Sequence, residues 1–361
     1  MGNTEQVTFF RKMRPVSTPP DKNNQMRIPL FLLLFVTACA TTADSDMPEP
    51  SDPPQESWEV RADIPHRVQE VYPALHQGQI YLAGGFSPDA DQGISDRVYI
   101  YNPDSDEWSQ GPSLPELRHH PYLVSTGAEL FSIGGFIVAN GGQWSASTDI
   151  FRLNVTTNSW EKVADLLIPQ SETVATYIGD KIYIASGRTP VGTQNANWND
   201  QGDINNLQVF DPSTLEVSFG PAASVRRNSG AGAEIDGKLY VVGGRVVGGG
   251  NVTANEVFDP ATGQWSTLAP MPNAQGGIAA AALNGRLYVF GGEFFNNSGG
   301  GVYSESWEYD PATDAWSRIA DMPVPRHGLG AVTVGDEIFV IAGATQAGGV
   351  GTTNRLSVYS R

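Results

Sequence analysis

Residues 79–85 read QIYLAGG, a β-branched and aromatic run that ends in two glycines. The alternation and length of this run predict a strand, and the glycines allow backbone angles and close approach that a Cβ would forbid. Similar runs recur about every 50 residues, which is typical of a repeat protein. The five further copies are ELFSIGG (129–135), KIYIASG (181–187), KLYVVGG (238–244), RLYVFGG (286–292) and EIFVIAG (337–343).

A variable loop, a second strand, a polar turn and usually a tryptophan follow each copy. The second strands are VYIYNP (98–103), DIFRLN (149–154), LQVFDP (207–212), NEVFDP (255–260) and SWEYDP (306–311). The tryptophans are Trp108, Trp160, Trp265 and Trp316. Val217 or Phe219 takes this place in the repeat that contains LQVFDP, and we expect looser outer packing there.

The order Gly-Gly, then Tyr or Phe before Asp-Pro, then Trp resembles the kelch repeat over residues 56–361. The resemblance implies a β-propeller of four-stranded antiparallel blades. The last segment, RLSVYSR (355–361), is a third strand without a fourth, and SWEVRADIP (57–65) is similar to the fourth-strand phrase AWSRIADMP (315–323). We therefore predict an all-β, six-bladed kelch propeller, its ring closed by the N-terminal strand pairing with the C-terminal three strands in one blade. The alternative, an open solenoid, would leave two edges unpaired.

Composition narrows the classes of function. The 361 residues include 22 basic and 39 acidic side chains, giving a formal charge of -17. This charge disfavours unaided binding to nucleic acid or anionic lipid. The single cysteine, Cys39, excludes a disulfide framework and thiolate metal clusters.

A targeting segment is predicted at the N-terminus. Residues 28–38 form an apolar run of eleven after Arg27, too short for the roughly 20 residues that span a bilayer. The run ends in Val36-Thr37-Ala38-Cys39, which resembles the lipobox of bacterial lipoproteins and implies that Cys39 is lipidated. The predicted divisions are a gene-model extension or disordered segment (1–25), a lipoprotein signal peptide (26–38), an acidic, proline-rich tether (39–57) and the propeller (58–361).

Location follows from the same segment. Ala40 after the cysteine fits the sorting pattern of outer-membrane lipoproteins, so we expect a protein of the bacterial cell envelope that meets the membrane through its lipid anchor only. Radiolabelled fatty acid should enter the wild-type protein and not the Cys39→Ser variant. Labelling that survives this substitution would remove the assignment.

Three arginines are candidate ligand-binding residues. When the repeats are aligned on their glycine pairs, Arg118, Arg227 and Arg326 occupy one position before the innermost strand of alternating blades. Guanidinium groups bind carboxylates in a bidentate manner, so the pattern predicts a cationic mouth for an anionic sugar or an envelope protein. In the alternative interpretation they are framework residues, solvated or bonded to loop carbonyls.

Acid–base candidates lie two residues further on, at Glu70, His120 and Glu172. Positions two apart share a strand face, and a carboxylate pair or a carboxylate–imidazole pair suits general acid–base catalysis. The alternative is that these groups neutralise the arginines or contact water. His119 and His327, one position earlier, are expected to point away from the face that carries the arginines and to bond between blades.

Long loops after the glycine pairs carry Trp144 and Trp198, which we predict to bind ligand by packing on sugar rings. The alternative is that they pack against a neighbouring loop. No metal or cofactor is expected, because zinc-type spacing is absent from the sequence and the adjacent His119 and His120 should project to opposite faces.

Two resemblances bear on enzyme activity. The repeats are similar to the galactose oxidase propeller, whose copper radical site needs a cysteine cross-linked to a tyrosine, but the single cysteine here, Cys39, is the predicted lipidation site directly after the signal peptide. The chain also resembles six-bladed kelch sialic acid mutarotases, which implies that the three arginines clamp a carboxylate while Glu70 or Glu172 moves a proton. Three functions stay open: binding an anionic carbohydrate or protein at the mouth, cofactor-free mutarotation or epimerisation of a sugar acid, and an inert protein-interaction scaffold.

Overall fold

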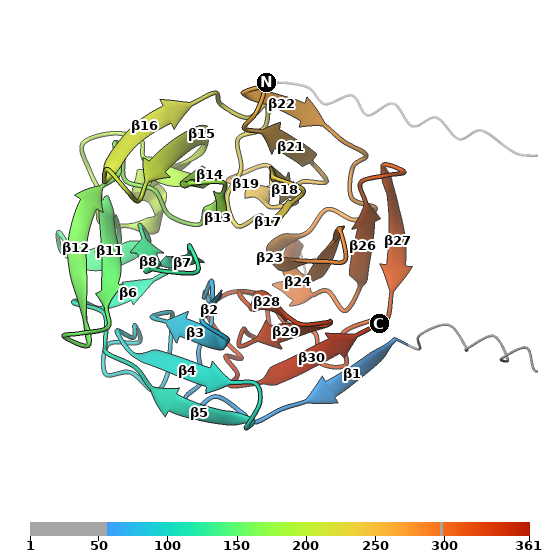
Figure 1. The fold of residues 1–361 in the computed structure, drawn as a ribbon, viewed down its shortest axis with the longest axis horizontal. Coiled ribbons are helices and arrows are strands. Elements are labelled where there is room, and N and C mark those ends of the chain that lie inside the picture. Colours follow the sequence, from blue (N-terminus) through green and yellow to red (C-terminus); the bar gives the residue numbers. More distant parts are fainter. Residues whose placement is uncertain (1–55, 297–298) are drawn as a thin grey trace, which may run out of the picture. The chain divides into compact units, whose positions relative to one another are not determined.

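A computed structural model describes residues 56–296 and 299–361, which form short antiparallel strands around a common axis (Figure 1). Blade 1 contains β2 (Ala74–His76), β3 (Gln79–Ala83), β4 (Val98–Asn102) and β5 (Glu107–Gln110). Blade 2 contains β7 (Tyr122–Ser125), β8 (Leu130–Ile133), β11 (Asp149–Asn154) and β12 (Ser159–Asp165). Blade 3 contains β13 (Val174–Ile178), β14 (Lys181–Pro190), β15 (Gln201–Asp211) and β16 (Glu216–Gly220).

The second half of the ring repeats this plan. Blade 4 contains β17 (Ala231–Ile235), β18 (Lys238–Val242), β21 (Asn255–Asp259) and β22 (Gln264–Thr267). Blade 5 contains β23 (Gly276–Leu283), β24 (Arg286–Asn296), β26 (Ser306–Asp310) and β27 (Ala315–Ile319). Blade 6 contains β28 (Gly330–Val334), β29 (Glu337–Ile341), β30 (Leu356–Ser360) and β1 (Ser57–Val60). The arrangement confirms the predicted all-β propeller class.

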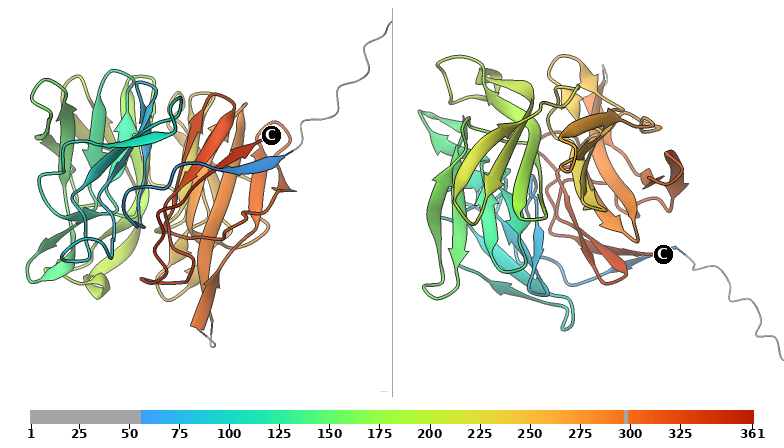
Figure 2. Two further views of the ribbon diagram at one scale, coloured as in Figure 1. Left: turned by 90° about the horizontal axis from the view of Figure 1, so that it is seen from below. Right: turned by 45° about the horizontal axis from the view of Figure 1, so that its top comes forward.

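Additional elements lie in the segments after the glycine pairs, which we call the mouth loops (residues 86–97, 136–148, 188–205, 245–254, 293–305 and 344–355). They are β9 (Phe136–Ala139) and β10 (Gly142–Ala146), β19 (Arg245–Val246) with β20 (Gly250–Asn251), β25 (Gly299–Val302) beside β24, and the 3-10 helix η1 (Trp198–Asp200). A short strand outside these loops, β6 (Arg118–His119), pairs with β9. Figure 2 shows β24 extending beyond the ring at the end where η1 lies.

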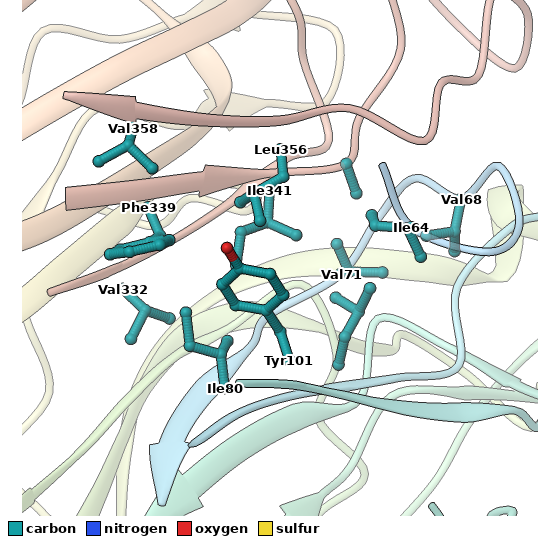
Figure 3. Packing of buried hydrophobic residues seen from close by; sticks show 12 residues of the cluster. Ile64, Val68, Val71, Ile80, Tyr101, Val332, Phe339, Ile341, Leu356 and Val358 are labelled. Carbon is teal, nitrogen blue, oxygen red and sulfur yellow. The ribbon is translucent and has the colours of Figure 1, made fainter. Parts of the chain in front are cut away.

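Blade 6 joins the two ends of the described chain. Strand β1 pairs antiparallel with β30, from Ser57 opposite Ser360 to Val60 opposite Ser357, and Figure 1 shows these two strands side by side. Tyr101 of blade 1 packs against Phe339 of blade 6 in one buried cluster (Figure 3). Apolar burial therefore holds the first blade to the last.

The repeated tryptophans link successive blades. Each lies in or beside an outer strand, and its indole nitrogen donates a hydrogen bond to a carbonyl that follows the outer strand of the preceding blade. The bonds run from Trp58 to Ala320, Trp108 to Ala62, Trp160 to Pro112, Trp265 to Pro221 and Trp316 to Ala269. Blade 3 has Val217 and an exposed Phe219 instead, and the looser packing expected there stays a prediction.

The glycine pairs permit close contact between neighbouring blades. A Cβ on Gly84 would lie 2.3 Å from the carbonyl oxygen of Arg118 in the next blade. The second residue of every pair donates its backbone N–H to the next blade, and these six bonds are Gly85 to Arg118, Gly135 to Gln170, Gly187 to Arg227, Gly244 to Gln275, Gly292 to Arg326 and Gly343 to Val68. The sequence repeat is thus explained by contact between blades as well as by the strands themselves.

Cys39, the predicted signal peptide and nearly all of the predicted tether lie outside the described residues, so lipidation and location stay predictions. Within residues 56–296 and 299–361, the structure has no helix of the length and apolarity needed to cross a bilayer.

Candidate functional site

A cavity of about 670 Å³ lies at the mouth of the ring, and residues of all six blades line it. We call it the mouth cavity. Among its lining residues are Glu70, His120, Glu172, Ser229, Glu293 and His327, one from each blade. A second space along the innermost strands, lined by glycines, alanines and the rings of Tyr72 and Tyr122 among others, is only about 30 Å³. The mouth cavity is large enough for a small organic ligand, whereas this second space is not.

Six residues with left-handed backbone angles form a ring around the axis, and four of them make the floor of the mouth cavity. The six are Glu70 (φ 59°), His120 (φ 56°), Glu172 (φ 51°), Ser229 (φ 49°), Gly277 (φ 70°) and Gly328 (φ 58°). Five backbone hydrogen bonds connect them around the axis, in the order His120 to Glu70, Glu70 to Gly328, Gly328 to Gly277, Gly277 to Ser229 and Ser229 to Glu172. The sequence alignment had placed these residues in matching positions, but on extended strands.

Four of the six are not glycine, although a left-handed angle costs a residue with a Cβ about 1–2 kcal/mol. Strain of this kind clusters at functional sites, so the choice of Glu, His and Ser points to a use for their side chains. The two glycines make room for those side chains: a Cβ on Gly328 would lie 2.8 Å from the carboxylate of Glu70, and one on Gly277 would lie 3.3 Å from Nη2 of Arg245.

His119 and His120 form a directed hydrogen-bond chain to Glu70. Nε2 of His119 lies 2.7 Å from the carbonyl oxygen of Gln143, so this nitrogen carries hydrogen. Burial, together with the charge on His120, holds the pKa of His119 well below its ordinary value, so Nδ1 of the neutral ring accepts. Nδ1 of His120 lies 2.7 Å from that acceptor and donates to it. The prediction that the two rings project to opposite faces is wrong. The backbone of His120 has a left-handed φ angle, so the two residues do not alternate as they would on an extended strand.

At the other end of this hydrogen-bond chain, His120 lies beside the carboxylate of Glu70. Nε2 of His120 lies 3.0 Å from Oε2 of Glu70. Burial alone would raise the pKa of Glu70, but the charge and hydrogen bond of His120, with His327 and Arg245 further away, outweigh it and lower the pKa to about 2. Glu70 is therefore ionised, and an imidazole nitrogen lies beside its carboxylate, an arrangement suited to binding hydroxyl groups or transferring a proton.

A second charged group faces this pair. Nη1 of Arg245 lies 2.6 Å from Oε1 of Glu293, whose Oε2 accepts from the backbone N–H of Gly348 at 2.7 Å. Burial would lower the pKa of Arg245, but Glu293 and, further away, Glu172 and Glu70 raise it overall. Arg245 thus stays charged and is already paired.

His327 lines the mouth cavity as well, whereas the neighbouring Arg326 does not. Its Nε2 lies 3.0 Å from the carbonyl oxygen of Gln346 and carries hydrogen. Its Nδ1 is buried with no hydrogen-bond partner among the described residues, 3.5 Å from Glu293 and 3.9 Å from Glu70. A buried polar atom without a partner normally needs one, and a ligand hydroxyl would supply it.

Glu172 completes the floor on the opposite side. Its Oε2 accepts from the hydroxyl of Ser229 at 2.7 Å, and its Oε1 lies 3.6 Å from Nη1 of Arg188. The guanidinium of Arg188 lies over the ring of Trp198, 4.2 Å from its centroid. Glu172 therefore keeps one carboxylate oxygen without a close hydrogen bond.

Aromatic side chains form part of the wall. Trp144 and Trp198 both line the mouth cavity, and their packing on sugar rings stays a prediction. Trp144 also packs on Phe86 and Phe136, with ring centroids 5.4 and 5.1 Å away, so the contact with neighbouring loops holds too. Trp198 is 40% exposed.

The predicted cationic mouth is wrong. Arg118, Arg227 and Arg326 have no exposed surface, and none of them lines the mouth cavity. Each donates to the carbonyl of the first residue of the glycine pair in its own blade, which is Gly134, Gly243 or Ala342. That residue is left-handed (φ 56°, 57° and 62°), so its buried carbonyl needs a donor outside the regular ladder. The framework interpretation of these arginines accounts for the observed contacts.

The remaining bonds of these arginines also stay inside the blades. Nη2 of Arg118 lies 2.7 Å from Asp149, and Arg227 forms an ion pair with Glu256. Arg326 is bonded mainly to carbonyl oxygens, and burial, with the charge of Arg355, lowers its pKa to about 9.

Sequence reasoning missed Arg245 and Glu293, which carry much of the charge in the mouth cavity. Both directly follow a glycine pair, as Phe86 does in blade 1, and all three line the mouth cavity. Alignment on this position would have found them. Among the described residues, no group of three or more His, Cys, Asp or Glu is placed to hold a metal ion.

The ring of blades and its mouth cavity define the class of protein: a six-bladed β-propeller with a pocket of small-molecule size. The chain belongs to the KLHDC2/KLHL20/DRC7 Kelch-repeats domain family, which it matches over residues 71–269 and 172–360. The resemblance to kelch repeats seen in the sequence is thereby confirmed.

Individual relatives are distant. Kelch-like protein terF of Aspergillus terreus is 25% identical over 336 residues, 88% of this chain and 70% of that protein. Human Kelch-like protein 23 is 27% identical over 195 residues, 54% of this chain and 33% of that protein. Kelch-like protein 15 of Danio rerio is 28% identical over 251 residues, 65% of this chain and 40% of that protein. The match thus spans a third to two fifths of these two animal proteins.

The solved structure of YjhT is similar in fold, with a TM-score of 0.70 and 17% identity, over 82% of this chain and 96% of that one.

Proposed function

We propose that the chain binds a small polyhydroxylated ligand, of the carbohydrate class and without net negative charge, in the mouth cavity. The observation that carries this proposal is the set of side chains on the floor and wall. Three carboxylates (Glu70, Glu172, Glu293) face one guanidinium and two imidazoles, beside exposed indole surface. Carboxylates accept hydrogen bonds from sugar hydroxyls, and aromatic faces pack on sugar C–H groups.

The charge balance changes the class of ligand that the sequence pattern favoured. An anionic ligand would need free guanidinium groups, and the three predicted ones are buried in the blades. The one in the mouth cavity, Arg245, is already paired with Glu293. A further carboxylate would meet three existing ones, so electrostatic repulsion opposes an acidic sugar.

Binding should follow ligand charge. We expect neutral hexoses or their disaccharides to raise the melting temperature and to bind in calorimetry, whereas the matching uronic acids and sialic acid bind at least ten times more weakly. Glu172→Gln should weaken binding of the neutral sugar about tenfold, because a charge-assisted hydrogen bond is worth about 1.5–3 kcal/mol. Glu107→Gln, on the exposed outer strand β5, is the control and should bind like the wild type. Preference for the acids, or an unchanged affinity in Glu172→Gln, would contradict the proposal.

A second candidate is a cofactor-free sugar isomerase, favoured by the His120–Glu70 pair. His120 can act as the general acid toward the ring oxygen while a carboxylate accepts the proton of the anomeric hydroxyl, which opens a hemiacetal ring. Nuclear magnetic resonance of anomer exchange separates the two functions. Faster exchange with wild type than with His120→Gln supports the isomerase, and equal rates leave binding alone.

A further inference from the structure

A second hollow, of about 400 Å³, adjoins the mouth cavity. We call it the side groove. It lies between two hairpins of the mouth loops, β19–β20 and β24–β25, and it shares Trp198, Arg245 and Phe295 with the lining of the mouth cavity. The shared residues make the two spaces neighbours, so one elongated ligand can occupy both.

The chemistry of the side groove differs from that of the mouth cavity. Its lining contains no carboxylate, and its single charged residue is Arg245. Aromatic and aliphatic side chains dominate it: Trp198, Val246, Val247, Phe294, Phe295 and Tyr303. Phe295 is 62% exposed and Val247 is 39% exposed. Large apolar side chains that stay exposed beside a pocket mark a binding surface.

The β24–β25 hairpin is built to hold an aromatic wall. Phe294 pairs with Gly301 across the hairpin, and a Cβ on that glycine would lie 2.7 Å from Cζ of the Phe294 ring. Glycine is therefore needed for the ring to lie where it does. The ring also contacts Tyr303, with centroids 5.1 Å apart and planes tilted by 59°. The two rings form a preformed apolar surface, which lowers the entropy cost of binding.

We propose that the side groove binds an aromatic aglycone, and that the ligand is an aryl glycoside whose sugar ring occupies the mouth cavity. This inference rests on the proposed function. The carboxylates and imidazoles take the hydroxyl-rich part, and the uncharged aromatic groove takes the flat apolar part. Arg245, at the junction, faces both spaces, and its guanidinium can lie against the aryl ring while it bonds Glu293.

The test compares methyl and phenyl glycosides of the same hexose, taken from gluco, galacto and manno series, by calorimetry on the full chain. We expect the phenyl glycoside of the preferred sugar to bind at least tenfold more tightly than the methyl glycoside. The matching disaccharide should gain less than the phenyl compound. Phe294→Ala should remove most of the extra affinity for the phenyl glycoside and leave the affinity for the methyl glycoside within about twofold. The reason is that Phe294 lines the side groove but not the mouth cavity.

Controls separate the failure of this inference from failure of the proposed function. Val247→Ser, at an exposed position, tests the groove without removing an aromatic ring, and Phe219→Ala, exposed on outer strand β16, should behave like wild type. Equal affinity for methyl and phenyl glycosides, or a stronger gain with the disaccharide, overturns the aryl aglycone and leaves the mouth cavity function intact. Absence of binding by every glycoside overturns both.

Discussion

Removal of residues 355–361 should abolish cooperative folding of the whole ring. This segment contains β30, which lies between β29 and β1 in blade 6. Leu356 and Val358 belong to the cluster shared with blade 1, and Tyr359 to the cluster shared with blade 5. Each of these side chains is fully buried, and truncating one such residue costs about 2–5 kcal/mol. Losing all three, with two strand ladders, exceeds the roughly 5–15 kcal/mol that stabilises a typical protein.

Far- and near-ultraviolet circular dichroism with a thermal scan measures this effect. Deletion of Arg361 alone is the control, because that residue lies after β30 and its ion-pair partner Glu308 keeps a second partner in Arg286. The control should melt within a few degrees of wild type. A cooperative transition in the longer deletion, near the wild-type temperature, would mean that the blades do not depend on closure of the ring.

Arg227→Met should destabilise the protein by about 3–5 kcal/mol, because it leaves a buried charge without its partner. Arg227 has no exposed side-chain surface, and its partner Glu256 has 1%. The backbone N–H of Ser224 also donates to Glu256, at 2.8 Å, but a hydrogen bond does not replace a counter-charge. The double variant Arg227→Met/Glu256→Leu should recover much of the loss, since both charges are then removed.

Urea unfolding of the two single variants and the double variant measures this coupling. A double variant no more stable than Arg227→Met would contradict it.

The same proteins show whether Arg227 is a framework residue or a ligand-binding residue. Folded Arg227→Met should bind the neutral sugar within about twofold of wild type, because Arg227 does not line the mouth cavity. A tenfold loss of affinity would mean that Arg227 takes part in ligand binding.

The fold was predictable because the repeat reports contacts that every blade must make. The run before each glycine pair specifies a buried strand, and the tryptophans mark bonds to the preceding blade. The phrase SWEVRADIP placed Trp58 in the same role as Trp316. Such patterns are local, so a single sequence is enough to show them.

The candidate site was predicted only in part. Matching positions brought Glu70, His120 and Glu172 together in the mouth cavity, because each lies two to four residues before the innermost strand of its blade. The arginine prediction failed for a physical reason. The alignment shows that the three arginines occupy the same position in their repeats, but it does not show which group each side chain contacts. In the structure that group is the buried carbonyl of a residue with a left-handed backbone angle. The carboxylates on the third strands, Asp149 and Glu256, were the available signal that two of these arginines are buried partners.

A crystal structure of the protein with the neutral sugar that binds most tightly tests the central claim most directly. We predict that the sugar ring lies in the mouth cavity, with hydroxyl groups within hydrogen-bond distance of Glu172 and of Nδ1 of His327. A sugar found on the outer strands, or a mouth cavity that stays without ligand at saturating concentration, would contradict the account.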